Sequence, residues 1–282
     1  MSIKMIQERL NSYDCKSEIE EEQAIREITQ EVALVALGRT DFFKHAAFQG
    51  GTCLRIFYGL NRFSEDMDFI LKEPDRSFKL KPHVYALTDE LTAYGYNIEA
   101  ADRSKMDVTV RKAFLKDDSI GKVLQLNYGS QTGLLRKIRI KFEVDTNPPS
   151  GSELEIKYHD FPFVSSVVVQ DKPSLFAGKV HALLCRNYIK GRDWYDFLWY
   201  TSQGVEINYQ FLSSALNQQG TWRGQNVQVD LNWCRNRLEN AIESMDWKAT
   251  ALDVRRFIRV AEQPSLDLWS KDLFLAQLEK LK

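Results

Sequence analysis

Residues 50–71 read GGTCLRIFYGLNRFSEDMDFIL and contain a glycine turn, a short helix and an acidic strand in succession. A turn is predicted over Phe48–Thr52 and a helix over Cys53–Tyr58, which Gly59 is expected to end. A strand is predicted over Arg62–Leu71, because apolar and polar side chains alternate along it. The stretch therefore predicts a sheet with helices beside it in the first half of the chain.

The predicted strand carries Asp66 and Asp68 two positions apart, so both carboxylates should project from the same face. Arg62 and Ser64 share this face, and Ser64 is a candidate for contact with a nucleotide. Magnesium prefers oxygen ligands and keeps several waters, so two or three carboxylates are enough to bind it. Nucleotide transfer requires such cations to bridge phosphate oxygens. We therefore predict that Asp66 and Asp68 bind Mg²⁺, or alternatively Mn²⁺, as catalytic residues.

A third carboxylate is expected from the predicted strand Arg136–Asp145, whose apolar and polar side chains alternate cleanly. Glu143 and Asp145 both lie on its polar side and can complete the metal set. Glu143 is favoured because it lies deeper in the strand, whereas Asp145 is close to the turn that follows. An arrangement in which both lie near the metal stays open.

The glycine turn is predicted to bind the triphosphate of an NTP. Backbone N–H groups at the N-terminus of a helix attract anions, and Gly50 and Gly51 permit close approach of the backbone. The hydroxyl of Thr52 adds a donor at the same place. Arg55 lies one turn into the helix and is expected to contact phosphate as well.

A predicted helix over residues 174–189 carries Lys179 and Arg186 in the middle of its apolar stripe. Burying an unpaired cation is costly, and amphipathic helices normally exclude lysine from such a stripe. Both cations are therefore expected to face phosphate or carboxylates, and Arg186 is a candidate for nucleotide binding. In the alternative, both side chains extend along the helix and reach solvent.

The next predicted helix, over residues 193–202, carries Asp193 and Asp196 on one face, because they are three residues apart. Asp193 is alternatively the N-cap of this helix. Asp196 is interior, so its carboxylate needs a cation, which Lys179 or Arg192 can supply. We predict that Lys179 contacts the triphosphate and that Asp193 or Asp196, as catalytic residues, orient this lysine or the attacking hydroxyl.

Two parts of the sequence resemble known nucleotidyltransferases. Gly51-Thr52, followed after thirteen residues by Asp66-x-Asp68, resembles the first motif of the DNA-polymerase-β-like nucleotidyltransferase superfamily. The run FQGGTCLRIFYGLNRFSEDMDF is similar to the signature of the AbiEii/AbiGii toxin family, and the lysine helix followed by Arg-Asp-x-x-Asp continues the similarity. The resemblance covers roughly residues 40–260.

The resemblance implies an enzyme that acts as a toxin of a bacterial type IV (AbiE-like) toxin–antitoxin or abortive phage-infection system. Such an enzyme transfers a nucleotide from NTP to an acceptor, expected to be tRNA or another RNA, and releases pyrophosphate. The expected partner is a winged-helix antitoxin. The expected fold is α+β, with a nucleotidyltransferase-fold mixed sheet and flanking helices in residues 1–165 and a helical domain in residues 166–282.

The composition is that of a globular protein. Of 282 residues, 44% are hydrophobic and 27% are charged, which argues against disorder. Lysine and arginine number 38 and aspartate and glutamate 39, so any surface for RNA must be local. We expect a cytoplasmic protein without membrane contact, because neither a signal peptide nor an apolar run of transmembrane length is present. The four widely spaced cysteines predict reduced thiols, and neither disulfides nor a zinc site is expected.

Basic residues recur along strands predicted over Asp107–Phe114, Lys122–Tyr128 and Arg136–Asp145 and in the residues beside them. They form either a solvated face of the sheet or a track for an RNA backbone. The residues concerned are Lys105, Arg111, Lys112, Arg136, Lys137, Arg139 and Lys141.

Two other functions are compatible with the same residues. One is a non-catalytic module of this fold that binds nucleotide or a partner protein, although decay of an enzyme should remove its carboxylates first. The other is a nucleotidyltransferase for a small molecule such as an antibiotic, which uses the same metal chemistry on a sugar hydroxyl.

Overall fold

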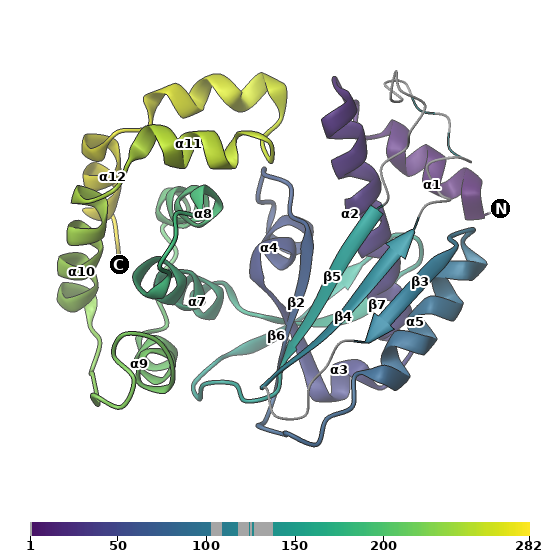
Figure 1. Ribbon diagram of the computed structural model, residues 1–282, viewed down its shortest axis with the longest axis horizontal. Helices are drawn as coiled ribbons and strands as arrows, with labels where there is room; N and C mark the ends of the chain where they lie inside the picture. Colours follow the sequence, from purple (N-terminus) through teal and green to yellow (C-terminus); the bar gives the residue numbers. More distant parts are fainter. Residues whose placement is uncertain (1, 103–108, 118–123, 125, 127–137) are drawn as a thin grey trace. The chain divides into compact units, whose positions relative to one another are not determined.

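The computed structural model describes residues 2–102, 109–117, 124, 126 and 138–282, and in these residues seven strands form one mixed sheet (Figure 1). The strand order is β3-β4-β5-β2-β1-β7-β6, with both parallel and antiparallel neighbours. The strands are β1 (Ala46–Gln49), β2 (Asp66–Leu71), β3 (Ile98–Asp102), β4 (Val110–Asp117), β5 (Ile138–Asp145), β6 (Leu154–His159) and β7 (Ser165–Gln170). The predicted α+β class with a mixed sheet is confirmed.

Both helices and strands occur in the first part of the chain, and helices make up nearly all of the last part. The helices of the described residues are α1 (Ser2–Asn11), α2 (Glu18–Gly38), α3 (Phe42–His45), α4 (Gly50–Tyr58), α5 (Lys81–Ala93), α7 (Lys172–Cys185), α8 (Gly191–Ser202), α9 (Tyr209–Gln218), α10 (Leu231–Glu243), α11 (Trp247–Arg255), the 3₁₀ helix η1 (Val260–Leu268) and α12 (Lys271–Leu278). The expectation that the chain after the sheet is helical is therefore confirmed.

The chain divides into two compact units. The first contains Met1–Pro148 and Ile156–Val169, and the second contains Pro149–Glu155 and Gln170–Lys282. The chain thus enters the second unit briefly at residues 149–155 before it completes the sheet of the first. We call the first the sheet unit and the second the helical unit.

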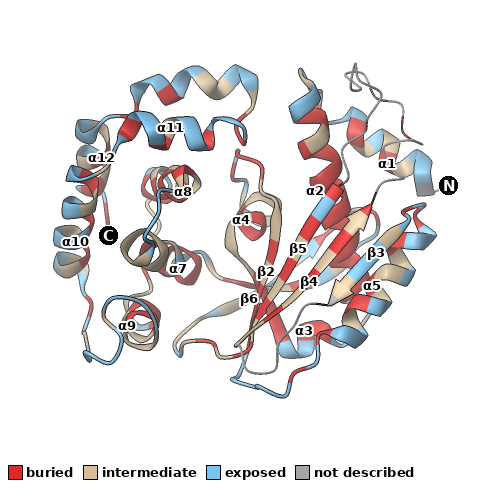
Figure 2. Cartoon of the chain, in the orientation of Figure 1, coloured by how far each residue is buried: buried red, intermediate tan, exposed pale blue. Residues whose placement is uncertain are grey.

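The core of the sheet unit is packed against one face of the sheet, where aromatic rings meet. Phe69 of β2 and Phe142 of β5 stack with ring centroids 4.6 Å apart, and Phe42 of α3 meets Phe69 edge-on at 4.9 Å. All three side chains are buried, and α2 is buried along nearly its whole length (Figure 2). Since side chains alternate along a strand, the polar residues of β2 and β5 lie on the opposite face.

Two local predictions near the glycine turn are wrong. Residues Ala46–Gln49 form a strand between β2 and β7, although Phe48 and Gln49 were expected in a turn. Four residues are too few to show an alternating pattern, and three of them are buried. Moreover, β2 begins only at Asp66, so Arg62 and Ser64 lie in the preceding loop and not on the strand face.

Other elements differ from the prediction in extent or have no predicted counterpart. The helix α4 begins at Gly50, three residues before its predicted start, and ends as predicted before Gly59, whose φ is +79°. The sequence pattern did not indicate β3. The strand predicted over Lys122–Tyr128 lies outside the described residues, except for residues 124 and 126.

The helical unit has an aromatic core of its own. Trp247 of α11 stacks on Phe274 of α12 with ring centroids 3.8 Å apart, and Trp194 of α8 meets both rings edge-on. The helices α8 and α11 approach so closely that a Cβ atom at Gly191 would lie 2.1 Å from the carbonyl oxygen of Thr250. Glycine is therefore required where α8 begins, directly before the aspartates of the predicted site.

All four cysteines, Cys15, Cys53, Cys185 and Cys234, are free thiols. Cys53 and Cys234 are buried and act as small apolar core residues. Among the described residues, no helix has both the length and the apolar character needed to cross a lipid bilayer.

Candidate active site

The predicted metal ligands lie on the polar face of the two central parallel strands. In the pairing of β2 with β5, Asp66 aligns with Lys141 and Asp68 aligns with Glu143. Because aligned residues of neighbouring strands point to the same side of a sheet, these four side chains share one face. We call them, together with Lys112 of β4, the carboxylate face, since Lys112 is the neighbour of Glu143 on the other side.

The glycine turn brings the N-terminus of α4 against this face. Gly50 has a φ of +78°, and a Cβ atom there would lie 2.8 Å from Oδ2 of Asp68. Only glycine accommodates both this left-handed backbone and this close approach. The carboxylate of Asp68 therefore lies beside the first residue of α4, where backbone N–H groups are available to an anion.

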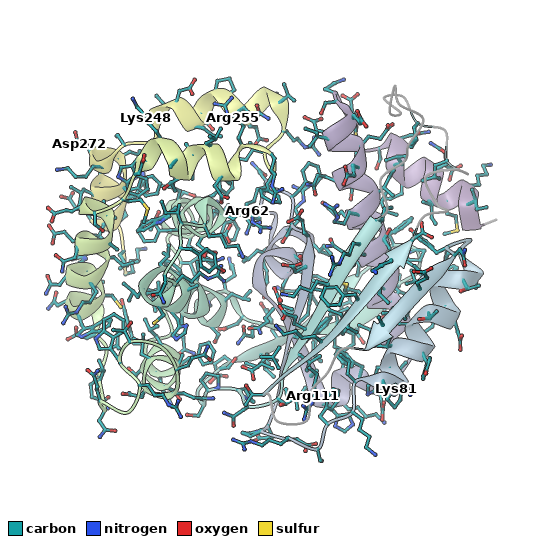
Figure 3. All side chains as sticks on the ribbon, viewed as in Figure 1. Arg62, Lys81, Arg111, Lys248, Arg255 and Asp272 are labelled. Atoms are coloured by element: carbon teal, nitrogen blue, oxygen red, sulfur yellow. The ribbon has the colours of Figure 1, made fainter. Side chains whose placement is uncertain are left out.

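The second glycine of the turn lies against two polar side chains from the loop before β2. A Cβ atom at Gly51 would be 2.6 Å from Nη2 of Arg62 and 3.0 Å from Oγ of Ser64. Arg62, which is labelled in Figure 3, comes from this loop. It is only 2% exposed, and its Nη1 donates a hydrogen bond to the carbonyl oxygen of Phe63 at 3.0 Å. The turn thus places a guanidinium and a hydroxyl at the start of α4.

Two predicted nucleotide contacts have structural partners instead. The buried hydroxyl of Thr52 donates to the carbonyl oxygen of Asp66, which ties α4 to β2. Arg55 donates from Nε to Glu27 at 2.9 Å and from Nη1 to the carbonyl oxygens of Leu60 and Asn61 at 3.0 and 2.7 Å. These contacts hold the end of α4 in place, and they do not support a role for Arg55 in phosphate binding.

Glu143, the favoured third ligand, is held by two lysines. Its Oε1 lies 2.8 Å from Nζ of Lys112 and its Oε2 lies 2.5 Å from Nζ of Lys141. Burial tends to raise the pKa of Glu143, but the hydrogen bonds and charges of both lysines together lower it. Glu143 is therefore a charged group that is already neutralised within the carboxylate face.

The pKa of Lys141 is affected by the two aspartates as well. Burial tends to lower the pKa of its ammonium group, but the hydrogen bond to Glu143 and the negative charges of Glu143, Asp66 and Asp68 raise it. Sequence reasoning placed Lys141 on the polar side of its strand and in a run of basic residues, but gave it no role at the site. Alternation puts it on the same strand face as Glu143, but its place beside Asp66 depends on the register between two distant strands.

Asp145, the other candidate ligand, lies further along β5. It aligns with Ile70 of β2. Its carboxylate accepts a hydrogen bond from the backbone N–H of Asn147 at 2.9 Å, and burial raises the pKa of this carboxylate. Of the two candidates, Glu143 is thus the direct neighbour of Asp68.

The carboxylates of the face are of the chemical type that binds a divalent cation. Asp66 and Asp68 offer carboxylate oxygens on one face, which is the type of ligand that Mg²⁺ takes together with waters. Within the described residues, no group of three or more acidic, histidine or cysteine side chains is arranged to hold a metal ion. The set Asp66, Asp68 and Glu143 therefore stays a prediction, and the pair of aspartates is its best-supported part.

The helical unit contains a second charged cluster. Nζ of Lys179 lies 2.6 Å from Oδ1 of Asp193 and 2.8 Å from Oδ2 of Asp196, and these three side chains are 13%, 3% and 0% exposed. The predicted pairing of this lysine with carboxylates is confirmed, and the alternative that its side chain reaches solvent is wrong. Arg192, the other candidate cation for Asp196, lies over the ring of Phe257 with its guanidinium carbon 4.0 Å from the centroid.

Asp193 forms ion pairs with two cations, Lys179 and Arg186. Its Oδ2 lies 3.2 Å from Nη1 of Arg186, which follows the last residue of α7. Burial tends to raise the pKa of Asp193, but the charges of Lys179, Arg186 and Lys190 lower it. The N-cap interpretation of Asp193 is wrong, because Lys190 is the N-cap and Asp193 lies inside the first turn of α8. We call Lys179, Asp193, Asp196 and Arg186 the lysine–aspartate cluster.

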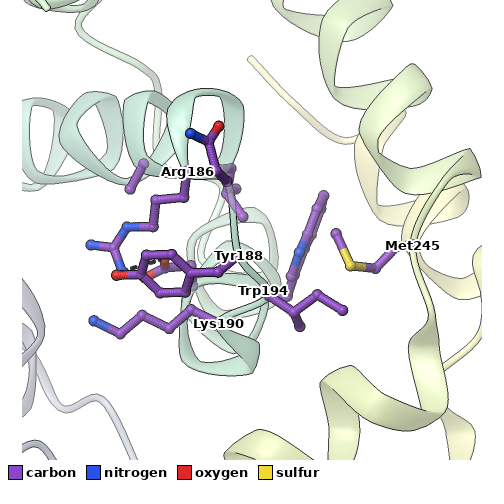
Figure 4. Close-up of a pocket in the computed structure, with 10 residues that line it drawn as sticks. Arg186, Tyr188, Lys190, Trp194 and Met245 are labelled. Atoms are coloured by element: carbon purple, nitrogen blue, oxygen red, sulfur yellow. Dashed lines mark hydrogen bonds and ion pairs between the residues drawn. The ribbon is translucent and has the colours of Figure 1, made fainter. Parts of the chain in front are cut away.

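A cavity of about 300 Å³ opens beside this cluster (Figure 4). Its lining combines two cations, one carboxylate and one amide with apolar and aromatic side chains: Ala182, Leu183, Arg186, Asn187, Tyr188, Ile189, Lys190, Asp193, Trp194 and Met245. Burial lowers the pKa of Lys190 to about 8; the charge of Asp193 opposes this shift, and the nearby cations Arg186, Arg192 and Lys179 add to it. Sequence reasoning assigned no role to Lys190, although it lies two residues before the Arg-Asp-x-x-Asp motif.

The predicted basic track is only partly described, and its described members do not share one face. Arg111 is buried and donates from Nη2 to the carbonyl oxygen of Arg76. Lys112 and Lys141 pair with Glu143, and the guanidinium carbon of Arg139 lies 4.3 Å from the ring centroid of Phe114. The remaining residues lie outside the described part of the chain: Lys105, Arg136 and Lys137.

Comparison with known proteins yields one family match. A family model described as "Nucleotidyl transferase AbiEii toxin, Type IV TA system" matches residues 32–272, which include both charged clusters. No curated protein matches the chain. A solved structure from H. pylori, described as a candidate nucleotidyltransferase, aligns with 90% of this chain and 95% of its own at 15% identity and a TM-score of 0.48. JHP933 from Helicobacter pylori aligns with 92% of this chain and 94% of its own at 15% identity and a TM-score of 0.49.

Proposed function

Because the chain belongs to the AbiEii family of type IV nucleotidyltransferase toxins, we propose that it uses Mg²⁺, or alternatively Mn²⁺, to transfer a nucleotide from NTP to RNA. The expected acceptor is tRNA, and pyrophosphate is the leaving group. The observation that carries this proposal is the pair of carboxylates, Asp66 and Asp68, on one sheet face beside the glycine-bearing start of α4.

In this proposal Asp66 and Asp68 hold the divalent cation. When bound, the cation would neutralise phosphate charge and favour loss of the proton from the attacking hydroxyl. The backbone N–H groups that begin at Gly50 and Gly51 would bind phosphate oxygens, with the hydroxyl of Ser64 beside them. The buried guanidinium of Arg62 stabilises this turn by lying against Gly51.

The helical unit has cations of its own that can bind phosphate. Lys179 is the proposed contact to the triphosphate, and Asp193 and Asp196 act as positioning residues that fix its ammonium group. Arg186 and Lys190 line the neighbouring cavity and add two cations that a phosphate group can neutralise.

The biological setting follows from the family. A type IV toxin implies an antitoxin partner and a nucleotide substrate. We further propose that the partner is a winged-helix protein and that the toxin acts on RNA in the cytoplasm.

The proposal is tested by incubating the full chain with each α-³²P-labelled NTP, total tRNA and Mg²⁺, and by following the transfer of label to RNA. We expect transfer from at least one NTP, and we expect Asp66→Asn to abolish it. Asp89→Asn is the matched control, because Asp89 is an exposed carboxylate on α5 of the same unit.

Full transfer by the Asp66→Asn protein would show that the carboxylate pair does not have the assigned role. Transfer of label to a small molecule but not to tRNA or other RNA would keep the enzyme class and overturn the proposed acceptor. A folded protein that binds NTP without turnover would refute the proposed transfer reaction as a whole.

A further inference from the structure

The carboxylate face already contains a cation of the protein itself beside the predicted metal ligands. Lys141 is the neighbour of Asp66 across the β2–β5 pair, and its Nζ lies 2.5 Å from Oε2 of Glu143. Lys112 approaches the same carboxylate from β4, with its Nζ 2.8 Å from Oε1. Glu143 therefore binds lysines through both of its oxygens.

This arrangement changes the charge that the face can accept. The five side chains that define the face are three carboxylates and two ammonium groups, so together they carry one net negative charge when all are ionised. One divalent cation reverses that charge to a net positive value. A second divalent cation that used the oxygens of Glu143 would lie close to the ammonium group of Lys141, which repels it.

We propose that the ammonium group of Lys141 takes the place of a second metal ion, so that the carboxylate face binds a single divalent cation through Asp66 and Asp68. Glu143 is then a positioning residue that holds Lys141, and Lys112 holds Glu143 from the other side. This inference rests on the proposed function, because it assumes that the aspartate pair binds a metal.

The role given to Lys141 fits the chemistry of its side chain. A lysine ammonium is a compact point charge with three donors, which suits a position where charge on a phosphate or an attacking oxygen has to be balanced. Unlike a metal ion, it is covalently attached and cannot be lost to a chelator. The site would therefore need one divalent cation from solution, and Lys141 would supply the second positive charge.

The test counts Mn²⁺ ions bound to the full chain without nucleotide, using the electron paramagnetic resonance signal of free Mn²⁺ and titration calorimetry. We expect one Mn²⁺ per wild-type chain and none for Asp66→Asn. Lys141→Met should bind Mn²⁺ roughly tenfold more tightly, or bind a second ion, because a nearby positive charge is removed. Lys79→Met is the matched control, since Lys79 is exposed in the same unit, and it should leave binding unchanged.

Two Mn²⁺ ions bound to the wild-type protein, both lost in Asp66→Asn, would overturn the inference without any lysine variant. Absence of Mn²⁺ binding to the wild-type protein would overturn it as well. The inference would also be wrong if a folded Lys141→Met protein bound Mn²⁺ with the same affinity and stoichiometry as wild type. Lys141→Arg keeps the charge and should keep one Mn²⁺ per chain, which covers the case in which Lys141→Met does not fold. The readout is independent of transfer: one Mn²⁺ without transfer to RNA contradicts only the proposed function, and two with transfer contradict only this inference.

Discussion

The carboxylate face and the lysine–aspartate cluster both combine acidic and basic side chains, but they differ in burial. In the cluster, the side chains of Lys179, Asp193 and Asp196 are 13%, 3% and 0% exposed. On the face, Lys112 is 42% exposed and Lys141 32%. Ion pairs in water gain little net free energy, whereas removal of one partner from a buried pair leaves an uncompensated charge in a medium of low polarity.

The difference in burial indicates which of the two regions can change its ion pairs. The partly exposed side chains of the carboxylate face can exchange partners at low cost, which suits a place where a cation and a nucleotide arrive and leave. The buried cluster cannot give up a carboxylate without a large penalty. It therefore holds Lys179 in one position and contributes to the stability of the helical unit.

The largest expected effect tests the buried side of this comparison. Asp196→Asn should lower the free energy of unfolding by about 3 kcal/mol, because Lys179 loses the charge of a fully buried partner. Urea denaturation followed by circular dichroism measures the change. Asp272→Asn, at an exposed carboxylate in the first turn of α12, should cost less than about 0.5 kcal/mol. Equal losses in both variants would remove the distinction between buried and exposed charges.

The glycine turn gives the next largest effect and a closely matched control. Gly50 and Gly59 have φ values of +78° and +79°, but only a Cβ atom at Gly50 would meet Asp68, at 2.8 Å from Oδ2. Each substitution by alanine should cost about 1 kcal/mol of backbone strain. Gly50→Ala should in addition displace Asp68 and reduce the rate of nucleotide transfer at least tenfold. Equal transfer rates in the two variants would show that Asp68 tolerates displacement.

A smaller effect of opposite sign is expected at the cavity. Lys190→Met should raise the free energy of unfolding at pH 7 by about 1 kcal/mol, because it removes a cation that burial disfavours, and it should weaken NTP binding. With a folded-state pKa of about 8 and an unfolded value of 10.5, the unfolded wild type binds more protons between these values. Wild-type stability should therefore gain a contribution as the pH rises through this window, and Lys190→Met should lack it. Denaturation at pH 7 and pH 9.5 measures the stability of both proteins and its change with pH. A variant with the same pH dependence of stability as wild type would contradict the assigned pKa of Lys190.

The smallest effect is expected on the carboxylate face. Lys112→Met should change the free energy of unfolding by less than about 0.5 kcal/mol, because its ion pair with Glu143 is accessible to water. Thermal or urea denaturation at low and at 0.5 M salt measures the change and its screening. A loss close to that of Asp196→Asn would mean that the face is as rigid as the cluster.

Much of the candidate site could be predicted because it depends on local sequence. Asp66 and Asp68 share a face through the period of a strand, and Lys179 was recognised because a cation in an apolar helical stripe needs a partner. The αL conformation at Gly59 follows a helix in the way that glycine commonly permits. In each case the spacing of residues and the chemistry of single side chains are sufficient.

The remainder depends on contacts between distant segments, which no local pattern encodes. Arg55 was expected to bind phosphate but pairs with Glu27, which comes from α2 and is 28 residues earlier. The pairing of Lys141 with Glu143 was compatible with strand alternation, but its position beside Asp66 is set by the register of β2 and β5. Strand β1 was missed because a four-residue buried strand shows no alternation.

The parallel pairing of β1 with β7 has a consequence for when the toxin can first act. Phe48 lies opposite Val169, so the sheet is completed only after the ribosome has synthesised more than half of the chain. Before that, β1 has an open edge, and the residues of the lysine–aspartate cluster have not been made. A growing or prematurely terminated polypeptide would therefore lack both the complete sheet and Lys179, and on the proposed mechanism it would not yet transfer nucleotides.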